Sequence, residues 1–163
     1  MRIAFAGTGY ISKFHAQAAQ NLGLELVALV NHKTDSMNEF GRRFNISRQY
    51  TDVETMLKEG KVDAFVVGTP NYLHLSQTMA ALNAGVHVMV EKPMAMNAKD
   101  AEQMCEAAEK VSALLMVAHC WRFDPDVLWL KEQSPKLGKI IRTKGYGVHT
   151  NWGPNGWFTQ KEL

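Results

Sequence analysis

The sequence has 163 residues, of which 46% are hydrophobic, and its formal net charge is +2. This length and composition suit one folded domain and exclude a disordered or collagen-like chain. The chain has eighteen basic and sixteen acidic residues, with no basic run longer than two. This distribution does not indicate a basic surface for binding nucleic acid or membrane lipid. We therefore expect a globular protein that binds neither.

The start of the chain and its two cysteines indicate in which cellular compartment the protein is expected. Met1 to Phe5 lead directly into an apolar run without a basic leader, and no apolar stretch approaches the roughly 18 residues of a membrane helix. Cys105 and Cys120 form no Cys-x-x-Cys motif, so we expect two buried thiols and no disulfide or ligand pair. These observations predict a cytoplasmic protein without a membrane segment.

Short runs that are apolar at nearly every position, rich in Val, Ile, Leu or Phe, predict five strands. These runs lie at Arg2–Ala6, Leu24–Val30, Ala64–Val67, Val86–Val90 and Leu114–Ala118. They lack the alternation of a half-exposed strand, which is typical of parallel strands that helices cover on both faces.

Helical patterns separate these runs. The first, which stops at Gly23, has its apolar residues at Ile11, Phe14, Ala18, Ala19 and Leu22. Two similar patterns lie at Leu75, Thr78, Met79 and Leu82, and at Ala101, Met104, Cys105, Ala108 and Val111. This alternation of strand and helix predicts βαβ units and therefore an α/β fold with a doubly wound parallel sheet.

The alternation ends after Ala118. Asp124 and Pro125 are residue types of a helix N-cap and first position, and the helix they predict runs to about Gln133. Ile140–Thr150 then predicts one more strand, followed by a loop rich in Trp, Gly, Pro and Asn. We expect residues 1–121 to form one domain, and residues 122–163 to form a linker helix and the first strand of an incomplete second α/β domain.

A glycine-rich turn joins the first predicted strand to the first predicted helix. In Gly7-Thr8-Gly9-Tyr10-Ile11, the first Gly permits a tight turn, and the second lets the backbone approach a pyrophosphate. The helix N-terminus offers unpaired N–H groups to that anion. The third position of the fingerprint is Ser12, which is still small enough for close helix–strand packing. The alternative is a glycine turn without a ligand, but the placement between strand and helix predicts a dinucleotide site.

The end of the second predicted strand bears on which dinucleotide binds. A carboxylate about 20 residues past the glycines usually holds the adenosine ribose, but this chain has Asn31, His32 and Lys33 there. Asn31 can hydrogen-bond a hydroxyl without repelling a 2′-phosphate, and Lys33 can attract that phosphate. These residues favour NADP over NAD, with an ordinary solvated Lys33 as the alternative.

Two further segments follow predicted strands, at the edge where open α/β sheets bind their ligands. One begins with Thr69-Pro70-Asn71 and includes His74, and the other is Glu91-Lys92-Pro93. Pro93 keeps Lys92 out of the helical conformation, which can direct its side chain into the cleft. A partly desolvated lysine there can accept or donate a proton during hydride transfer, although a lysine after a strand is otherwise an ordinary surface residue.

Four motifs stand together along the chain. They are Gly7-Thr-Gly-Tyr-Ile-Ser with His15, Thr69-Pro-Asn-x-x-His74, Gly85-Val-His-Val-x-x-Glu91-Lys-Pro93 and Trp121-Arg122-Phe123-x-Pro125. In this combination the chain resembles the Gfo/Idh/MocA oxidoreductases, the relatives of glucose–fructose oxidoreductase and inositol dehydrogenase. The resemblance covers nearly the whole chain, and Glu-Lys-Pro in its setting is its most specific part.

The resemblance implies an NAD(P)-dependent oxidation or reduction at a hydroxyl or carbonyl carbon of a sugar, cyclitol or related small molecule. It implies that Lys92 is catalytic, hydrogen-bonding the reacting oxygen and taking part in proton transfer, and that Arg122 lies near cofactor or substrate. Asn31 departs from the acidic residue that many members carry. The expected cofactor-binding residues are Gly7, Thr8, Gly9, Tyr10, Ile11, Asn31, His32, Lys33, Thr69, Pro70, Asn71, His74, Glu91, Lys92 and Arg122.

Members of that family have a second domain that covers the cofactor, often builds the oligomer and supplies a catalytic Asp and His. No positions of this chain match that pair. The chain is therefore expected to be either the cofactor-binding half of an oxidoreductase or a non-catalytic dinucleotide-binding sensor or partner module. Redox-neutral glycoside cleavage with tightly bound NAD is a third possibility. Exposed apolar tail residues, namely Ile140, Ile141, Trp152 and Trp157, predict either self-association into a homo-oligomer or disorder of the tail.

The remaining histidines are expected to be structural. They are His15, His87, His119 and His149. Their spacing from Cys, Asp and Glu predicts no metal site.

Overall fold

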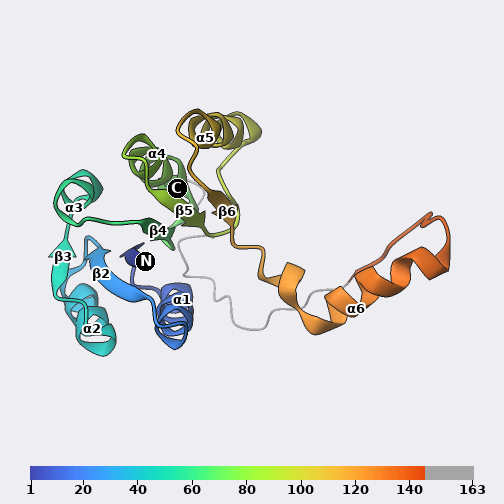
Figure 1. Ribbon diagram of the computed structural model, residues 1–163, viewed down its shortest axis with the longest axis horizontal. Coiled ribbons are helices and arrows are strands. Elements are labelled where there is room, and N and C mark those ends of the chain that lie inside the picture. The colour runs from blue at the N-terminus through green and yellow to red at the C-terminus, as the bar shows by residue number, and fades with distance from the viewer. Residues whose placement is uncertain (146–163) are drawn as a thin grey trace, which may run out of the picture. The chain divides into compact units, whose positions relative to one another are not determined.

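The structure of the protein, a computed structural model, describes residues 1–145 (Figure 1). The chain divides into two compact units, of which the first is Met1–Ala118 and the second begins at His119.

A six-stranded sheet forms the centre of the first unit, and all of its strand pairs are parallel. The strand order is β3-β2-β1-β4-β5-β6, so the chain winds outward from β1 in two directions. This arrangement confirms the predicted α/β doubly wound fold. The strands are β1 (Arg2–Ala6), β2 (Glu25–Val30), β3 (Arg48–Tyr50), β4 (Ala64–Val67), β5 (His87–Val90) and β6 (Leu115–Val117).

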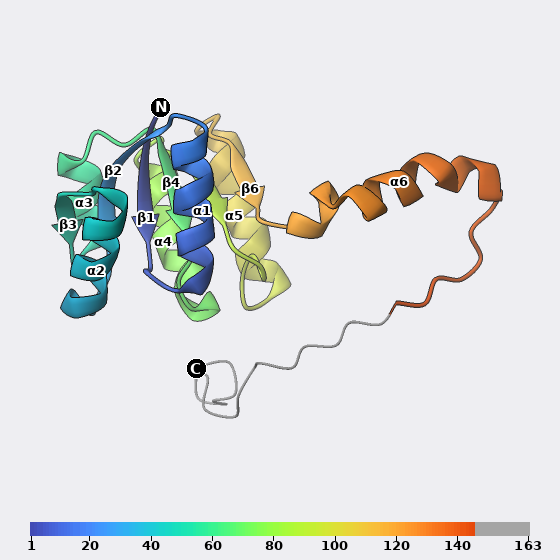
Figure 2. The ribbon, with the colours of Figure 1, turned by 90° about the horizontal axis from the view of Figure 1, so that it is seen from below.

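Helices cover both faces of the sheet, as Figures 1 and 2 show. One face carries α1 (Tyr10–Asn21) and α2 (Thr34–Phe44), and the other carries α3 (Val53–Glu59), α4 (His74–Asn83) and α5 (Ala98–Lys110). Successive strand residues alternate between the two cores, since Phe5 packs beneath α1 and α2 whereas its neighbours Ala4 and Ala6 pack on the opposite side. Because both faces are buried, the strands are apolar at nearly every position.

The sequence patterns do not predict three elements of the first unit, namely α2, β3 and α3. The strand β3 has only three residues, and Arg-Gln-Tyr carries no strand signal. Both helices do have a signal in the sequence. α2 buries Phe40 and Phe44 four residues apart, and Asp52 caps α3 by accepting a hydrogen bond of 2.7 Å from the Thr55 amide.

The buried face of α1 differs from the predicted one. The apolar pattern places Phe14 and Leu22 on the buried side, but these side chains are 56% and 75% exposed. The buried residues of this helix are Ser12, Ala16 and Ala19. The reason is the short distance between helix and sheet, since a Cβ added at Gly68 would lie 2.5 Å from the Ser12 hydroxyl oxygen. A large side chain at position 12 of α1 would therefore not fit against Gly68.

The described part of the second unit is helical. Its helix α6 (Pro125–Gln133) is the one predicted from Asp124 and Pro125, and the Asp124 carboxylate accepts hydrogen bonds from the amides of Asp126 and Val127. The 3₁₀ turns η2 (Cys120–Phe123) and η3 (Ser134–Leu137) flank it.

The strand predicted from Ile140 is not formed over residues 140–145, where the backbone has no ladder to join. The remainder of that predicted strand, together with Trp152 and Trp157, lies outside the described residues.

Both cysteines are free and exposed, so the prediction of buried thiols is wrong. Cys105 follows the buried Met104 on α5 and points away from the core, and Cys120 begins η2.

Replacing Phe40 by Ala is expected to lower the free energy of unfolding by about 3–5 kcal/mol, because it empties a filled core position. Phe40 is 1% exposed, and its ring centroid lies 6.1 Å from that of Phe5 and 4.6 Å from that of Phe44. The matched control is Phe14→Ala on the exposed side of α1, which should cost under about 1 kcal/mol. Urea unfolding measures both, and equal losses would contradict the assignment of the buried face.

Candidate functional site at the carboxyl edge of the sheet

The carboxyl ends of four strands meet at one edge of the sheet. In the parallel register Ala6 pairs with both Val30 and Val67, and Val67 pairs with Val90. The segments that follow these strands therefore start side by side. The strand order reverses between β1 and β4, which is where open α/β sheets bind their ligands.

The turn between β1 and α1 has the geometry of a phosphate-binding loop. Gly7 has a φ of +86°, and its amide donates to the Val30 carbonyl over 2.9 Å. A Cβ at Gly7 would lie 2.7 Å from the Gly68 carbonyl oxygen, so this position requires glycine. Gly9 is the N-cap of α1, supplies no side-chain cap and has open space where a Cβ would stand. The first amides of α1 are thus available to an anion, and the loop fits a pyrophosphate.

Asn31 joins this loop to the start of α2. Its Nδ2 lies 3.0 Å from Thr8 Oγ1, 2.9 Å from Ser36 Oγ and 3.2 Å from the Lys33 carbonyl oxygen. His32 and Lys33 are exposed beside it. An uncharged amide therefore takes the place of the carboxylate that would repel a 2′-phosphate. Sequence reasoning misses Ser36, because only the fold brings the first turn of α2 to Asn31.

The segment after β4 is tied to the segment after β5 through His74, the first residue of α4. His74 is only 1% exposed, its Nε2 lies 2.9 Å from the Thr69 carbonyl oxygen, and its Nδ1 lies 2.8 Å from the Pro93 carbonyl oxygen. The Thr69 hydroxyl donates to Gln77 Oε1 over 2.7 Å. His74 therefore contacts the protein backbone with both ring nitrogens, and its expected contact with a cofactor stays a prediction.

Glu91 is a buried carboxylate, 8% exposed, directly before Lys92. Its Oε1 lies 2.8 Å from His15 Nε2, and its Oε2 accepts a hydrogen bond of 3.1 Å from the Lys92 amide. Burial acts to raise the pKa of Glu91, but the hydrogen bonds from His15 and the Lys92 amide, together with the electrostatic influence of these two residues, outweigh it and lower the pKa overall. Glu91 therefore carries its charge while most of its surface is buried.

Lys92 itself is exposed at the edge, and its peptide bond to Pro93 is cis. Within the first unit, the expected partial desolvation of this lysine stays a prediction. Tyr10 is also exposed, with its ring edge-on to that of Phe14 at a centroid separation of 4.8 Å. Pro70 and Asn71 are half-buried at the start of the 3₁₀ turn η1 (Asn71–Leu73).

Ile11 is partly exposed on the first turn of α1. Arg122 lies in η2, in the second unit, and its nearness to a cofactor stays a prediction.

A family model for Gfo/Idh/MocA proteins, described as an oxidoreductase family with an NAD-binding Rossmann fold, matches residues 1–119. The chain belongs to this family. The match spans the strand ends and turns of the candidate site in the first unit, and it confirms the resemblance that the sequence motifs indicate.

Relatives in the Gfo/Idh/MocA family include named dehydrogenases. The D-glucoside 3-dehydrogenase of Escherichia coli strain K12 is 35% identical over the full length of this chain and 48% of its own. The scyllo-inositol 2-dehydrogenase (NADP(+)) of Bacillus subtilis strain 168 is 32% identical over 87% of this chain and 44% of its own length.

A solved structure gives the same picture. The WlbA dehydrogenase of Bordetella pertussis, in complex with NADH and UDP-GlcNAcA, matches with a TM-score of 0.79 and 29% identity over 83% of this chain and 42% of that one. The chain thus spans less than half the length of each of these three relatives.

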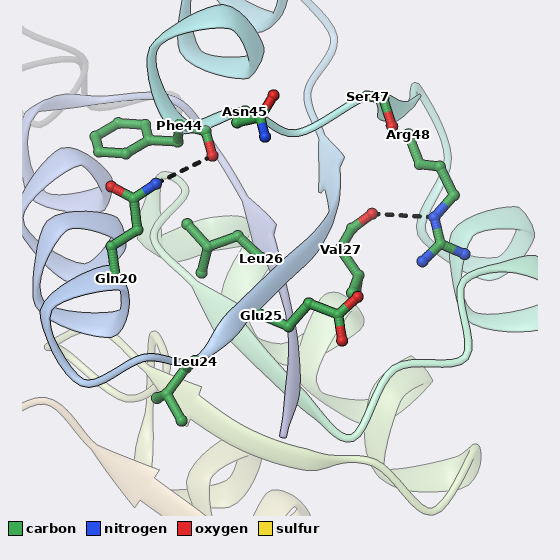
Figure 3. A pocket seen from close by; sticks show the side chains of 9 residues that line it. All are labelled: Gln20, Leu24, Glu25, Leu26, Val27, Phe44, Asn45, Ser47 and Arg48. Atoms are coloured by element: carbon green, nitrogen blue, oxygen red, sulfur yellow. Dashed lines mark hydrogen bonds between the residues drawn. The ribbon is translucent and has the colours of Figure 1, made fainter.

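A cavity of about 370 Å³ lies at the opposite, amino edge of the sheet (Figure 3). It forms beside the start of β2, where Gln20 donates to the Phe44 carbonyl and Arg48 donates to the Val27 carbonyl. None of the predicted site residues of this Gfo/Idh/MocA chain lines the cavity, so the cavity is separate from the candidate site at the carboxyl edge of the sheet.

Residues 1–145 contain no cluster of three or more His, Cys, Asp or Glu side chains suited to a metal ion. Within the same range, the helices are all too short or too polar to cross a membrane.

Gly7→Ala is expected to weaken NADPH and NADH binding by roughly tenfold or more, since the added methyl pushes the phosphate loop away from β4. The matched control is Gly85→Ala. Gly85 also has a positive φ, of +72°, but open space surrounds its Cβ position. Both variants carry backbone strain, and only Gly7→Ala should change the dissociation constant in a fluorescence titration. Unchanged cofactor affinity in a folded Gly7→Ala protein would remove this loop from the site.

Proposed function

We propose that this chain is the cofactor-binding part of an NAD(P)-dependent oxidoreductase that acts on a hydroxyl or carbonyl carbon of a sugar, cyclitol or similar small molecule. The observation that carries the proposal is the meeting of the phosphate loop and the Lys92 turn at one sheet edge. Relatives named as dehydrogenases of a glucoside and of an inositol support this substrate class.

Different residues of the carboxyl edge would bind different parts of the cofactor. The amides around Gly7 and Gly9 would bind the pyrophosphate, and Asn31 and Lys33 would bind the adenosine ribose with its 2′-phosphate. Pro70, Asn71 and Glu91 would line the nicotinamide end. When bound, the nicotinamide supplies or accepts the hydride. The protein contributes orientation and a fixed route for the proton.

Lys92 is the proposed catalytic residue. Oxidation of an alcohol removes a hydride from carbon and a proton from oxygen, and the unprotonated Lys92 Nζ would accept that proton. In reduction the Lys92 ammonium returns a proton to the carbonyl oxygen as it becomes a hydroxyl. Both steps need Nζ within hydrogen-bond reach of the reacting oxygen, which makes the placement of this turn decisive.

The proposed preference for NADP depends on charge at the end of β2. Asn31 is neutral, and the exposed Lys33 follows two residues later. A relative named for NADP(+) and a related structure that holds NADH show that the family uses both cofactors.

We also propose, from the sequence, that the protein acts in the cytoplasm as a homo-oligomer.

Asn31→Asp is expected to shift binding from NADPH toward NADH by roughly tenfold or more in the ratio of dissociation constants, because it sets a carboxylate against the 2′-phosphate. Asn83→Asp, at the exposed far end of α4, makes the same change of net charge away from the cofactor edge. Titration of both cofactors against both variants measures the ratio. An unchanged ratio in Asn31→Asp would refute the role of this position.

Lys92→Met in the protein that contains this chain is expected to lower kcat by about 10²–10⁴, because the group that transfers the proton is lost. Turnover is followed by cofactor absorbance over a panel of sugars and cyclitols. A Lys92→Met protein with the kcat of the parent would rule out the catalytic role. Cofactor binding without turnover by the parent on any substrate would instead favour a binding module.

A further inference from the structure

The turn that carries Lys92 is held from both faces of the sheet. On one face His15 of α1 contacts the Glu91 carboxylate, with Nε2 and Oε1 2.8 Å apart. On the other face His74 of α4 contacts the Pro93 carbonyl, with Nδ1 and oxygen 2.8 Å apart. The two helices lie on opposite sides of the sheet in Figure 1. Each neighbour of Lys92 in the chain is thus bound by a histidine.

The contacts of His74 favour a hydrogen on each ring nitrogen. Both ring nitrogens face backbone carbonyl oxygens, those of Thr69 at 2.9 Å and Pro93 at 2.8 Å. A carbonyl oxygen only accepts hydrogen bonds, so each nitrogen must bring a hydrogen. A neutral ring would place one nitrogen lone pair against an oxygen lone pair, in a site that is only 1% exposed.

His87 provides the contrast within the same molecule. Its Nδ1 accepts a hydrogen bond of 3.0 Å from the Leu114 amide, so this nitrogen carries no hydrogen. The two histidines therefore differ in the number of ring protons that their contacts demand.

The His15 side of the turn is organised around the charge of Glu91. Both carboxylate oxygens are engaged, one by His15 and the other by the Lys92 amide. A charged hydrogen bond of this kind fixes the carboxylate and, through the Lys92 amide, the backbone at the residue that bears Nζ.

We propose that His15 and His74 are positioning residues that fix the backbone of Glu91-Lys92-Pro93 from two sides, and that His74 does so with a hydrogen on each ring nitrogen. Lys92 has a long flexible side chain, so the reach of Nζ depends on a backbone that does not move. The purpose of this clamp rests on the proposed catalytic role of Lys92. The geometry of the clamp does not depend on that role.

The protons of His74 are tested directly by NMR of the full chain labelled with ¹⁵N-histidine, near neutral pH and without cofactor. We expect both ring nitrogens of His74 to resonate as protonated nitrogens, and His87 to show one protonated and one unprotonated nitrogen. Spectra of His74→Gln and His87→Gln assign the signals. An unprotonated ring nitrogen at His74 would overturn the double contact.

The clamp itself is tested by hydrogen exchange at the Lys92 amide, which donates to Glu91. His15→Leu is expected to speed this exchange roughly tenfold or more, because the Glu91 carboxylate loses its partner. His15→Gln keeps a donor at the Nε2 position and should restore slow exchange. His87→Leu is the matched control and should leave Lys92 unchanged.

Two variants test the two hydrogen-bond contacts of His74 separately. His74→Asn keeps a donor near the Nδ1 position toward Pro93, whereas His74→Gln keeps a donor near the Nε2 position toward Thr69. We expect Lys92 exchange to be faster in His74→Gln than in His74→Asn, with amide exchange in β1 reporting that both remain folded. Equal and unchanged Lys92 exchange in His15→Leu and His74→Gln would refute the clamp.

These measurements use no substrate or cofactor, so they separate the clamp from the proposed function. A confirmed clamp with no turnover by the intact protein would remove the catalytic role of Lys92 alone. Turnover that persists while the Lys92 amide is insensitive to both histidines would remove the clamp alone.

Discussion

The site depends on the close contact between the turn after β1 and the end of β4. A Cβ at Gly7 would meet the Gly68 carbonyl oxygen at 2.7 Å, and a Cβ at Gly68 would meet the Ser12 hydroxyl at 2.5 Å. Backbone therefore packs on backbone where the strand order reverses. This contact sets the N-terminus of α1 at the sheet edge, and it also restricts the buried face of α1 to small side chains.

The parallel register extends this edge to the other functional segments. Since Val67 and Val90 end β4 and β5 side by side, the Thr69 and Glu91 segments emerge together next to the phosphate loop. Helices from both faces then contact the Lys92 turn through histidines. Before the exposed Lys92 stands the buried Glu91, and after it the exposed Pro93, whose carbonyl oxygen contacts His74.

Membership of the Gfo/Idh/MocA family and the length of the relatives bear on how the chain works. The family match covers residues 1–119, while the chain spans less than half of the named dehydrogenases and of the NADH-bound structure. The described residues supply the carboxyl edge of the sheet and its phosphate-binding loop. Lys92 is exposed at this edge, next to the buried Glu91.

The sequence by itself determined five of the six strands of the sheet, the glycine turn, the α6 cap at Asp124 and the family, because each depends on local residue types or short spacings. It did not reveal β3, whose three residues pair only because β2 lies beside them, or the exposure of Phe14, which depends on how closely α1 approaches the sheet. The roles of His15, His74 and Ser36 were decided only by the tertiary structure. Their partners lie 76, 19 and 5 residues away in sequence, and only folding brings the polar atoms within hydrogen-bond distance.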